Sequence, residues 1–223
     1  MAAAPPELLP RADGDLLRRP RRSLAVAGLL LVAVAALTVL VAVDRGSPPA
    51  LGELDRWWRD VALAAPSWMR SLSRALKVLG SGAVMVPFRI AVALWLLARR
   101  RRHDLAAWLL AWAAADVLTF LLKPGLGRMR PDLVDAHSFP SGHAKTAAQV
   151  AVGLVLVLTS PWRSRLLPWA LAVLWIVAMA LSRTVLDEHW LSDVIAGALL
   201  GAACAVGVSA LVVLRRDRPR GSA

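Results

Sequence analysis

Six long apolar segments divide this chain, and they constrain its fold more than any other feature of the sequence. A helix needs about 20 mostly apolar residues to cross the hydrocarbon core of a bilayer, and a backbone in lipid satisfies its polar groups within a helix. The hydrophobic content of 58% exceeds what one soluble core requires. The segments are residues 23–43, 78–98, 105–122, 143–158, 166–181 and 190–214. We therefore predict an all-α fold, a six-span transmembrane helix bundle.

Residues 52–76, between the first two apolar segments, follow a different pattern. Tryptophan and leucine residues alternate there with arginine and aspartate, as in the run Trp57, Trp58, Arg59 and Asp60. A helix that lies in the plane of the membrane interface has this amphipathic composition. We expect an interfacial helical segment between spans one and two.

Arginine clusters beside the apolar segments hold most of the arginines of the chain, whose net charge is +12. Such clusters stay in the cytoplasm and thereby set the orientation of the spans. They occupy residues 18–22, 99–102, 163–165 and 215–220. With six spans, all four clusters fall on one side, so both termini are expected in the cytoplasm of a multi-pass cell-membrane protein. Because charge placement explains the clusters, we expect no nucleic-acid partner.

The resulting organisation has three regions. Residues 1–22 are predicted to be a disordered cytoplasmic tail, because they lack the order of charge, short apolar core and cleavage site of a signal peptide. Residues 23–214 form the six-span membrane domain, and residues 215–223 form a basic cytoplasmic tail. Cys204 is the only cysteine, which excludes a disulfide within the chain and a cysteine metal site.

Two charged residues lie inside the predicted spans, Arg89 in the second and Asp116 in the third. A charge at this depth is costly, so both are expected to face protein, and each is a possible partner of the other. We favour a structural polar contact over a role in proton or substrate movement.

The residues with catalytic potential lie in two outward loops and at the starts of the helices that follow them. They form three segments: Lys123-x6-Arg130-Pro131, Pro140-Ser141-Gly142-His143 and Ser182-Arg183-x5-His189-x3-Asp193. The three cations Lys123, Arg130 and Arg183 would neutralise the charge that spreads over a phosphoryl group during transfer. Ser141 and Gly142 precede a helix, where a hydroxyl and backbone N–H groups would bind an anion.

The third segment also offers a nucleophile. His189 and Asp193 are four residues apart at the start of the sixth span, so they are expected to share one helix face. The carboxylate would fix the imidazole tautomer and stabilise the positive charge formed when the other ring nitrogen attacks phosphorus. His143, across the site, would protonate the leaving oxygen and then deprotonate water. Taken singly, each residue has a structural explanation, such as a helix-capping contact between His189 and Asp193; the joint pattern favours a catalytic site.

These segments resemble the signature of the type 2 phosphatidic acid phosphatase superfamily. Every defining position of its K-x6-R-P, P-S-G-H and S-R-x5-H-x3-D motifs is present between residues 123 and 193. The superfamily includes lipid phosphate phosphatases, polyprenyl pyrophosphate phosphatases and soluble vanadium haloperoxidases. The resemblance implies that His189 is the nucleophile, Asp193 its partner and His143 the acid and base. It further implies a phosphate site formed by Lys123, Arg130, Ser141, Gly142 and Arg183.

The resemblance implies a metal-independent lipid phosphatase that forms a phosphohistidine at the extracytoplasmic face. Undecaprenyl pyrophosphate is the favoured substrate, and phosphatidylglycerol phosphate and phosphatidic acid are alternatives. No cofactor is expected, and Asp132, Asp135 and His137 are assigned to a solvated loop rather than to a metal site. Arg128, outside the motif, is a candidate contact for a second phosphate or headgroup. A lipid phosphotransferase with a polyprenyl pyrophosphate donor and a noncatalytic membrane transporter are the alternative functions, and the sequence predicts no oligomeric state.

Overall fold

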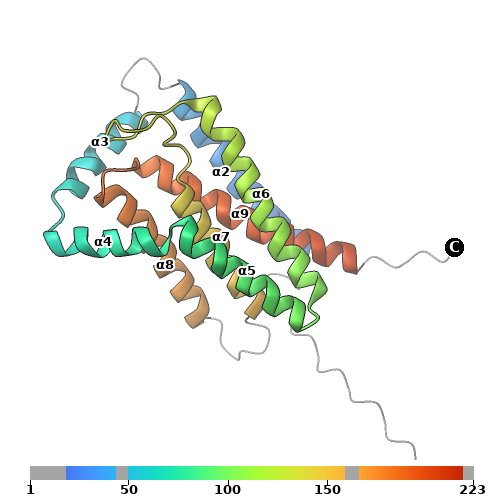
Figure 1. Ribbon diagram of the computed structural model, residues 1–223. Helices are drawn as coiled ribbons and strands as arrows, with labels where there is room; N and C mark the ends of the chain where they lie inside the picture. The colour runs from blue at the N-terminus through green and yellow to red at the C-terminus, as the bar shows by residue number, and fades with distance from the viewer. Residues whose placement is uncertain (1–18, 44–49, 159–165, 218–223) are drawn as a thin grey trace, which may run out of the picture.

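The computed structural model describes residues 19–43, 50–158 and 166–217, and in these residues it has eight helices and no strand (Figure 1). The helices are α2 (Pro20–Val43), α3 (Ala50–Leu63), α4 (Ser67–Leu79), α5 (Gly82–Ala98), α6 (Arg102–Leu126), α7 (Gly142–Leu158), α8 (Leu166–Val185) and α9 (Leu191–Arg216). The prediction of an all-α fold is confirmed. Residues 1–18 and 218–223 of the predicted tails, and the arginines at 163 and 165, lie outside the described residues.

Each of the six predicted spans corresponds to a helix, but the helices differ in their capacity to cross a bilayer. Among the described residues, four helices are long and apolar enough by themselves, namely α2, α6, α8 and α9. The pair α4 and α5, bent by 49° at its break, is a fifth candidate. Helix α7 has only 17 residues, 11 of them buried, so it runs through the interior of the bundle. The count of six spans therefore stays a prediction.

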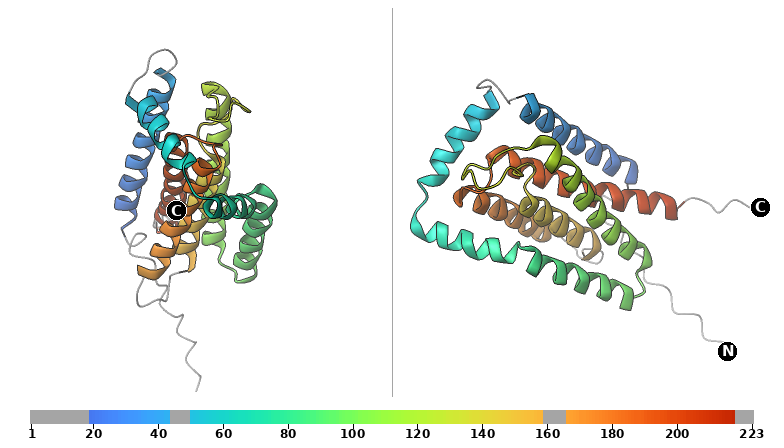
Figure 2. Two further views of the ribbon diagram at one scale, coloured as in Figure 1. Left: turned by 90° about the vertical axis from the view of Figure 1, so that its left-hand side faces the viewer. Right: turned by 45° about the horizontal axis from the view of Figure 1, so that its top comes forward.

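The segment predicted to lie at the interface forms two helices rather than one. Helix α3 ends at Leu63, and Pro66 immediately precedes α4, where its missing N–H removes no helical hydrogen bond. Helix α3 contacts α8 and α9, and α4 contacts α8 and α5. Both helices lie at the same end of the bundle as the loops that carry the three motifs (Figures 1 and 2).

Two glycines bring α7 and α9 into backbone contact beneath these loops. A Cβ atom on Gly197 would lie 2.4 Å from the carbonyl oxygen of Ser141, and one on Gly201 would lie 2.1 Å from that of Lys145. No side chain fits at either distance, so close packing of the two helices requires glycine at both positions. This packing fixes the start of α7 against the start of α9.

A cluster of charged side chains joins α5, α6 and α7, with both cations buried and Asp116 about half exposed. Arg89 forms an ion pair of 3.5 Å with Asp116, as the sequence suggested, and stacks 4.9 Å from the Trp112 ring. Lys145, a residue of α7 that none of the three motifs defines, donates to the other carboxylate oxygen of Asp116. The indole of Trp112 donates to the same carboxylate at 2.7 Å. These contacts agree with the structural role favoured for Arg89 and Asp116.

The two ends of the bundle differ in charge and in content. The first turn of α2, the connection between α5 and α6 and the last turn of α9 lie at one end (Figure 2). The arginines at 99–102, 215 and 216 lie in these segments. Helices α3 and α4 and the loops that precede α7 and α9 lie at the opposite end (Figure 1).

Candidate active site

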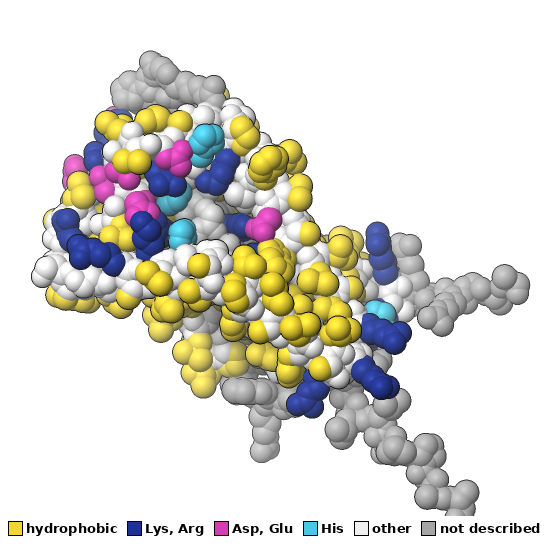
Figure 3. Space-filling model, in the orientation of Figure 1, with side chains coloured by type: hydrophobic (Ala, Val, Ile, Leu, Met, Phe, Trp, Pro, Cys, Tyr) yellow, Lys and Arg dark blue, Asp and Glu magenta, His cyan; other side chains and the backbone are white. Residues whose placement is uncertain are grey.

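The three motifs converge at the end of the bundle that holds α3 and α4. Figure 3 shows Lys, Arg, Asp, Glu and His side chains gathered there around a shallow hollow, whereas hydrophobic side chains cover the flank below it. The side chains come from the C-terminal part of α6, the loop 127–141, the start of α7, the end of α8 and the loop before α9. Segments that are far apart in the chain therefore form one site.

His189 and Asp193 form the buried centre of this site. The Nδ1 atom of His189 lies 3.5 Å from Oδ2 of Asp193, and the two residues are 5% and 0% exposed. The expectation that they share a helix face is wrong, because α9 begins at Leu191 and His189 lies in the loop before it. The contact forms because Asp193, in the first turn of α9, turns back toward the loop. There it also accepts a hydrogen bond of 2.9 Å from the backbone N–H of Trp190.

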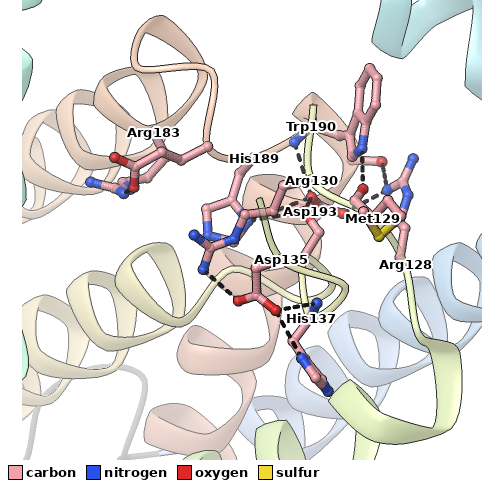
Figure 4. Close-up of polar contacts among 12 residues, drawn as sticks. Arg128, Met129, Arg130, Asp135, His137, Arg183, His189, Trp190 and Asp193 are labelled. Atoms are coloured by element: carbon pink, nitrogen blue, oxygen red, sulfur yellow. Dashed lines mark hydrogen bonds and ion pairs between the residues drawn. The ribbon is translucent and has the colours of Figure 1, made fainter. Parts of the chain in front are cut away.

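The carboxylate of Asp193 therefore both caps helix α9 and orients His189. Ser138 donates its hydroxyl to Oδ2 of Asp193 and lies 3.4 Å from Nδ1 of His189. Arg128 donates to the other oxygen, Oδ1, at 2.6 Å. Figure 4 shows Asp193 between His189 and Arg128. Since Nδ1 faces the carboxylate, Nε2 is the nitrogen in position to react.

The cations of the motifs surround this histidine, and each has one protein partner. Lys123 donates to the backbone carbonyl of His137 at 2.6 Å. Arg130 forms an ion pair of 3.2 Å with Asp135 (Figure 4), and Arg183 forms one with Glu188. The positive charges of Lys123 and Arg183 act on His189, and that of Arg130 acts on Arg183. The motif cations are therefore close enough to bind a single anion.

Several donors of the motif residues have no partner in the protein. In the described part of the chain, ten buried side-chain nitrogen or oxygen atoms lack a hydrogen-bond partner. Five of them belong to predicted site residues: the donors Nε of Arg130, Oγ of Ser141, and Nε and Nη1 of Arg183, and the ring nitrogen Nε2 of His143. A buried polar atom without a partner is costly, and such atoms are rare in folded proteins. Their concentration in one place is the pattern of a site built for an oxygen-rich anion.

The start of α7 contributes the second histidine. Ser141 is fully buried and is held by a hydrogen bond of 3.0 Å from its N–H to the carbonyl of Asp193. A Cβ atom on Gly142 would meet nothing within 4 Å, so the backbone at the helix N-terminus is open on that side. His143 follows, and its ring donates to the backbone carbonyl of Lys77 in α4. The unpartnered Nε2 of His143 then remains for a proton transfer.

Burial sets the protonation state of His189. Desolvation lowers its pKa below the usual 6.5, and the charges of Arg183 and Lys123 lower it further, whereas Asp193 opposes them. The ring is thus neutral at neutral pH, the form in which an imidazole is a nucleophile. In the loop, hydrogen bonding by His137 and the charge of Arg130 lower the pKa of Asp135, so this carboxylate stays ionised as a partner of Arg130.

Several residues of the site could not be predicted from the sequence, because no local sequence pattern marks them. Asp55 comes from α3, Lys77 from α4, and Ser138 and Glu188 from loop positions that the motifs leave undefined. Only the three-dimensional contacts identify them. In the described residues, no group of three or more His, Cys, Asp or Glu side chains is arranged to hold a metal ion.

The class of this membrane protein follows from its family. The family model of the PAP2 superfamily matches residues 104–217, half of the chain. The chain belongs to the PAP2 superfamily, so the family predicted from the three motifs is confirmed. The prediction of a multi-pass membrane enzyme that acts on lipid phosphates is confirmed with it.

Individual relatives and a solved structure support this assignment. The chain is 27% identical over 143 residues to phosphatidylglycerophosphatase B of Bacillus subtilis, which covers 60% of this chain and 70% of that protein. It is 34% identical over 122 residues to the undecaprenyl-diphosphatase of Sulfolobus acidocaldarius, covering 49% of this chain and 56% of that protein. The crystal structure of a PAP2-type phosphatidylglycerolphosphate phosphatase from Bacillus subtilis has a TM-score of 0.70 at 22% identity, over 85% of this chain and 98% of that one. This structural similarity shows that the two proteins share a fold.

Proposed function

We propose that this enzyme hydrolyses a lipid phosphate in two steps through a phosphohistidine on His189. In the first step Nε2 of His189 attacks phosphorus, and the bond to the leaving lipid oxygen breaks while His143, as the imidazolium, donates its Nε2 proton to that oxygen. In the second step His143 removes a proton from water, which attacks the phosphohistidine and releases inorganic phosphate. Asp193 holds the ring and balances its charge in both steps.

The observation that carries this proposal is the group of buried, unpartnered donors around His189. Arg130, Ser141 and Arg183 supply these donors. Such a set suits a ligand with several acceptor oxygens, and a phosphoryl group has three. Preorganised cations and N–H groups stabilise the charge of the transition state in a site that excludes water. Lys123, on the last turn of α6, completes the cationic set with Gly142 at the N-terminus of α7.

The substrate we favour is undecaprenyl pyrophosphate. A relative that is 34% identical carries the name undecaprenyl-diphosphatase, and the other named relative acts on phosphatidylglycerophosphate. A diphosphate has a lipid phosphate as its leaving group, which needs less help from the acid than an alcohol does. Phosphatidylglycerol phosphate and phosphatidic acid are the alternatives.

We further propose that the site faces the extracytoplasmic side and that both termini are cytoplasmic. The arginines at 99–102, 215 and 216 lie at the end of the bundle opposite the site. Positive residues of this kind stay in the cytoplasm. A cysteine introduced into the loop 127–141 would then react with an impermeant maleimide in intact cells. Labelling that requires permeabilised cells would contradict this orientation.

Phosphate release by the purified protein in detergent tests the proposed reaction. His189→Ala is expected to abolish release of phosphate from undecaprenyl pyrophosphate, because no other group takes the place of the nucleophile. His103→Ala, at the opposite end of α6, is the matched control and should retain activity. Wild-type turnover by His189→Ala would reject the proposed mechanism, and turnover only with an added acceptor lipid would instead indicate a phosphotransferase.

A further inference from the structure

An ion-pair network connects the interfacial helix α3 to the carboxylate that orients His189. Asp55 of α3 is 1% exposed, although a carboxylate is seldom buried so deeply without partners. It accepts hydrogen bonds from the backbone N–H of Ser192 at 2.9 Å and from the Ser192 hydroxyl at 2.6 Å. It also accepts one from Nη2 of Arg128 at 2.6 Å. Asp55 is therefore fixed against the first turn of α9.

Arg128 is the bridge of this network. Its Nη1 donates to Oδ1 of Asp193 at 2.6 Å and to the hydroxyl of Ser192 at 2.7 Å. Its guanidinium also lies 5.6 Å from the centre of the Trp190 ring, which holds its plane. Both terminal nitrogens are thus occupied by carboxylates. The hypothesis that Arg128 binds a second phosphate or headgroup does not fit these contacts.

The two carboxylate oxygens of Asp193 have different partners. Oδ2 faces Ser138, the backbone N–H of Trp190 and His189, whereas Oδ1 faces Arg128 alone among the contacts of the described residues. The position of Arg128 therefore decides the rotation of the carboxylate plane. It also separates two buried negative charges, Asp55 and Asp193, which would otherwise repel each other.

We propose that Arg128 and Asp55 are positioning residues of the reaction. Arg128 fixes the Asp193 carboxylate in the rotation that holds His189, and Asp55 anchors Arg128. Neither residue touches the substrate. This inference rests on the proposed function, because it assigns the network a role in orienting the proposed nucleophile.

The test compares Arg128→Gln, Arg128→Lys and Asp55→Asn with the control Arg59→Gln. Arg59 belongs to the same helix, α3, and pairs with Asp187 through two contacts of 2.7 Å, but it has no contact with Asp193. The Arg59→Gln change removes this half-exposed ion pair and the contact of Arg59 with the Trp190 ring, 6.0 Å away, but it leaves every partner of Asp193 in place, so its effect on kcat should be about fivefold or less. The probe is dioctanoyl phosphatidic acid in detergent, and released inorganic phosphate is measured.

We expect Arg128→Gln to lower kcat by about 100-fold, the size of effect that a misplaced catalytic group produces. KM should change little, since Lys123, Arg130 and Arg183 are intact. Arg128→Lys retains the charge without the two-pronged geometry, so it should recover only part of kcat. Wild-type kcat in Arg128→Gln, or equal losses in Arg128→Gln and Arg59→Gln, would overturn the inference.

The pH profile separates positioning from general damage to the fold. The charged or titratable groups that act on His189 are Asp193, Arg183, Lys123 and His143. Removal of the Arg128 charge leaves the field of Asp193 stronger, so the acid limb of kcat/KM should move to higher pH. Asp55→Asn leaves the Arg128 charge less compensated and should move the limb to lower pH. Shifts in the same direction for both variants would contradict the inference.

Failure of the inference can be told from failure of the proposed function in the same set of assays. If His189→Ala is inactive while Arg128→Gln has wild-type kcat and pH profile, only the inference fails. If His189→Ala is active, the proposed function fails. If Arg128→Gln does not fold, Arg128→Lys decides through its partial loss of kcat and Asp55→Asn through the direction of its pH shift.

Discussion

Gly197→Ala is the substitution for which the structure gives the clearest quantitative expectation. The added Cβ would lie 2.4 Å from the carbonyl oxygen of Ser141, and ordinary contacts of this kind begin at 3.4 Å. The neighbouring atom is backbone, so it has no flexible end that can move away. The start of α7 and the start of α9 must separate by roughly 1 Å, the difference between these two distances, as overpacked interfaces do.

This displacement acts on the catalytic geometry directly. Ser141 is bonded through its N–H to the carbonyl of Asp193 at 3.0 Å, and His143 follows two residues later. A misplacement of 1 Å in an active site costs about 100-fold in rate. We expect kcat to fall by about this factor, with a loss of about 1–3 kcal/mol in stability from overpacking.

Phosphate release and thermal unfolding of the purified protein measure the two effects. Gly207→Ala is the matched control, because its Cβ would lie 3.1 Å from a side-chain atom, the Cβ of Ala27, on the far part of α9. A shift of a few tenths of an ångström accommodates it, and activity should stay within about twofold. Wild-type kcat in Gly197→Ala would show that α7 and α9 are not in the contact described and would refute the reasoning.

Three further predictions concern charged groups. Because burial lowers the pKa of His189 below 6.5, the neutral nucleophile persists to lower pH, and the acid limb of kcat/KM in a pH–rate profile should lie below 6.5. Glu188→Gln removes the carboxylate that pairs with Arg183, so inorganic phosphate should inhibit more strongly, by roughly tenfold, in an inhibition assay. An unchanged inhibition constant would show that Glu188 does not compete with phosphate. Asp116→Asn leaves the buried cations Lys145 and Arg89 without their shared, half-exposed carboxylate and should destabilise the protein by about 3 kcal/mol in denaturant unfolding. Replacement of all three charges, by Asp116→Leu with Lys145→Met and Arg89→Met, should recover most of the loss.

The helices could be predicted from the sequence because their signal is local. Long apolar runs predicted the six helices α2 and α5–α9, with small errors at the ends such as the start of α2 at Pro20 rather than residue 23. Length alone did not reveal that α7 is an interior helix, because its burial depends on the helices around it. The break between α3 and α4 was missed although Pro66 marks it.

The site could be predicted only in part, for a related reason. The spacing of the motifs identified the residues that the fold brings together around His189, and the chemistry of their side chains suggested phosphate. The expected shared helix face of His189 and Asp193 was wrong, because spacing does not say where a helix begins. Asp55 could not be identified from the sequence, because its partners, Arg128 and Ser192, are far from it in the chain. Pairing of this kind is a property of the tertiary structure alone.

The most direct test of the account is the detection of phosphate on His189 during turnover. Farnesyl pyrophosphate is a suitable probe, because its lipid phosphate leaves without much help from an acid, and His143→Ala should slow the second step so that the intermediate accumulates. After a rapid alkaline quench, mass spectrometry is expected to find a phosphorylated peptide that contains His189. Phosphate on another residue, or no phosphopeptide while phosphate is still released, would contradict the proposed mechanism.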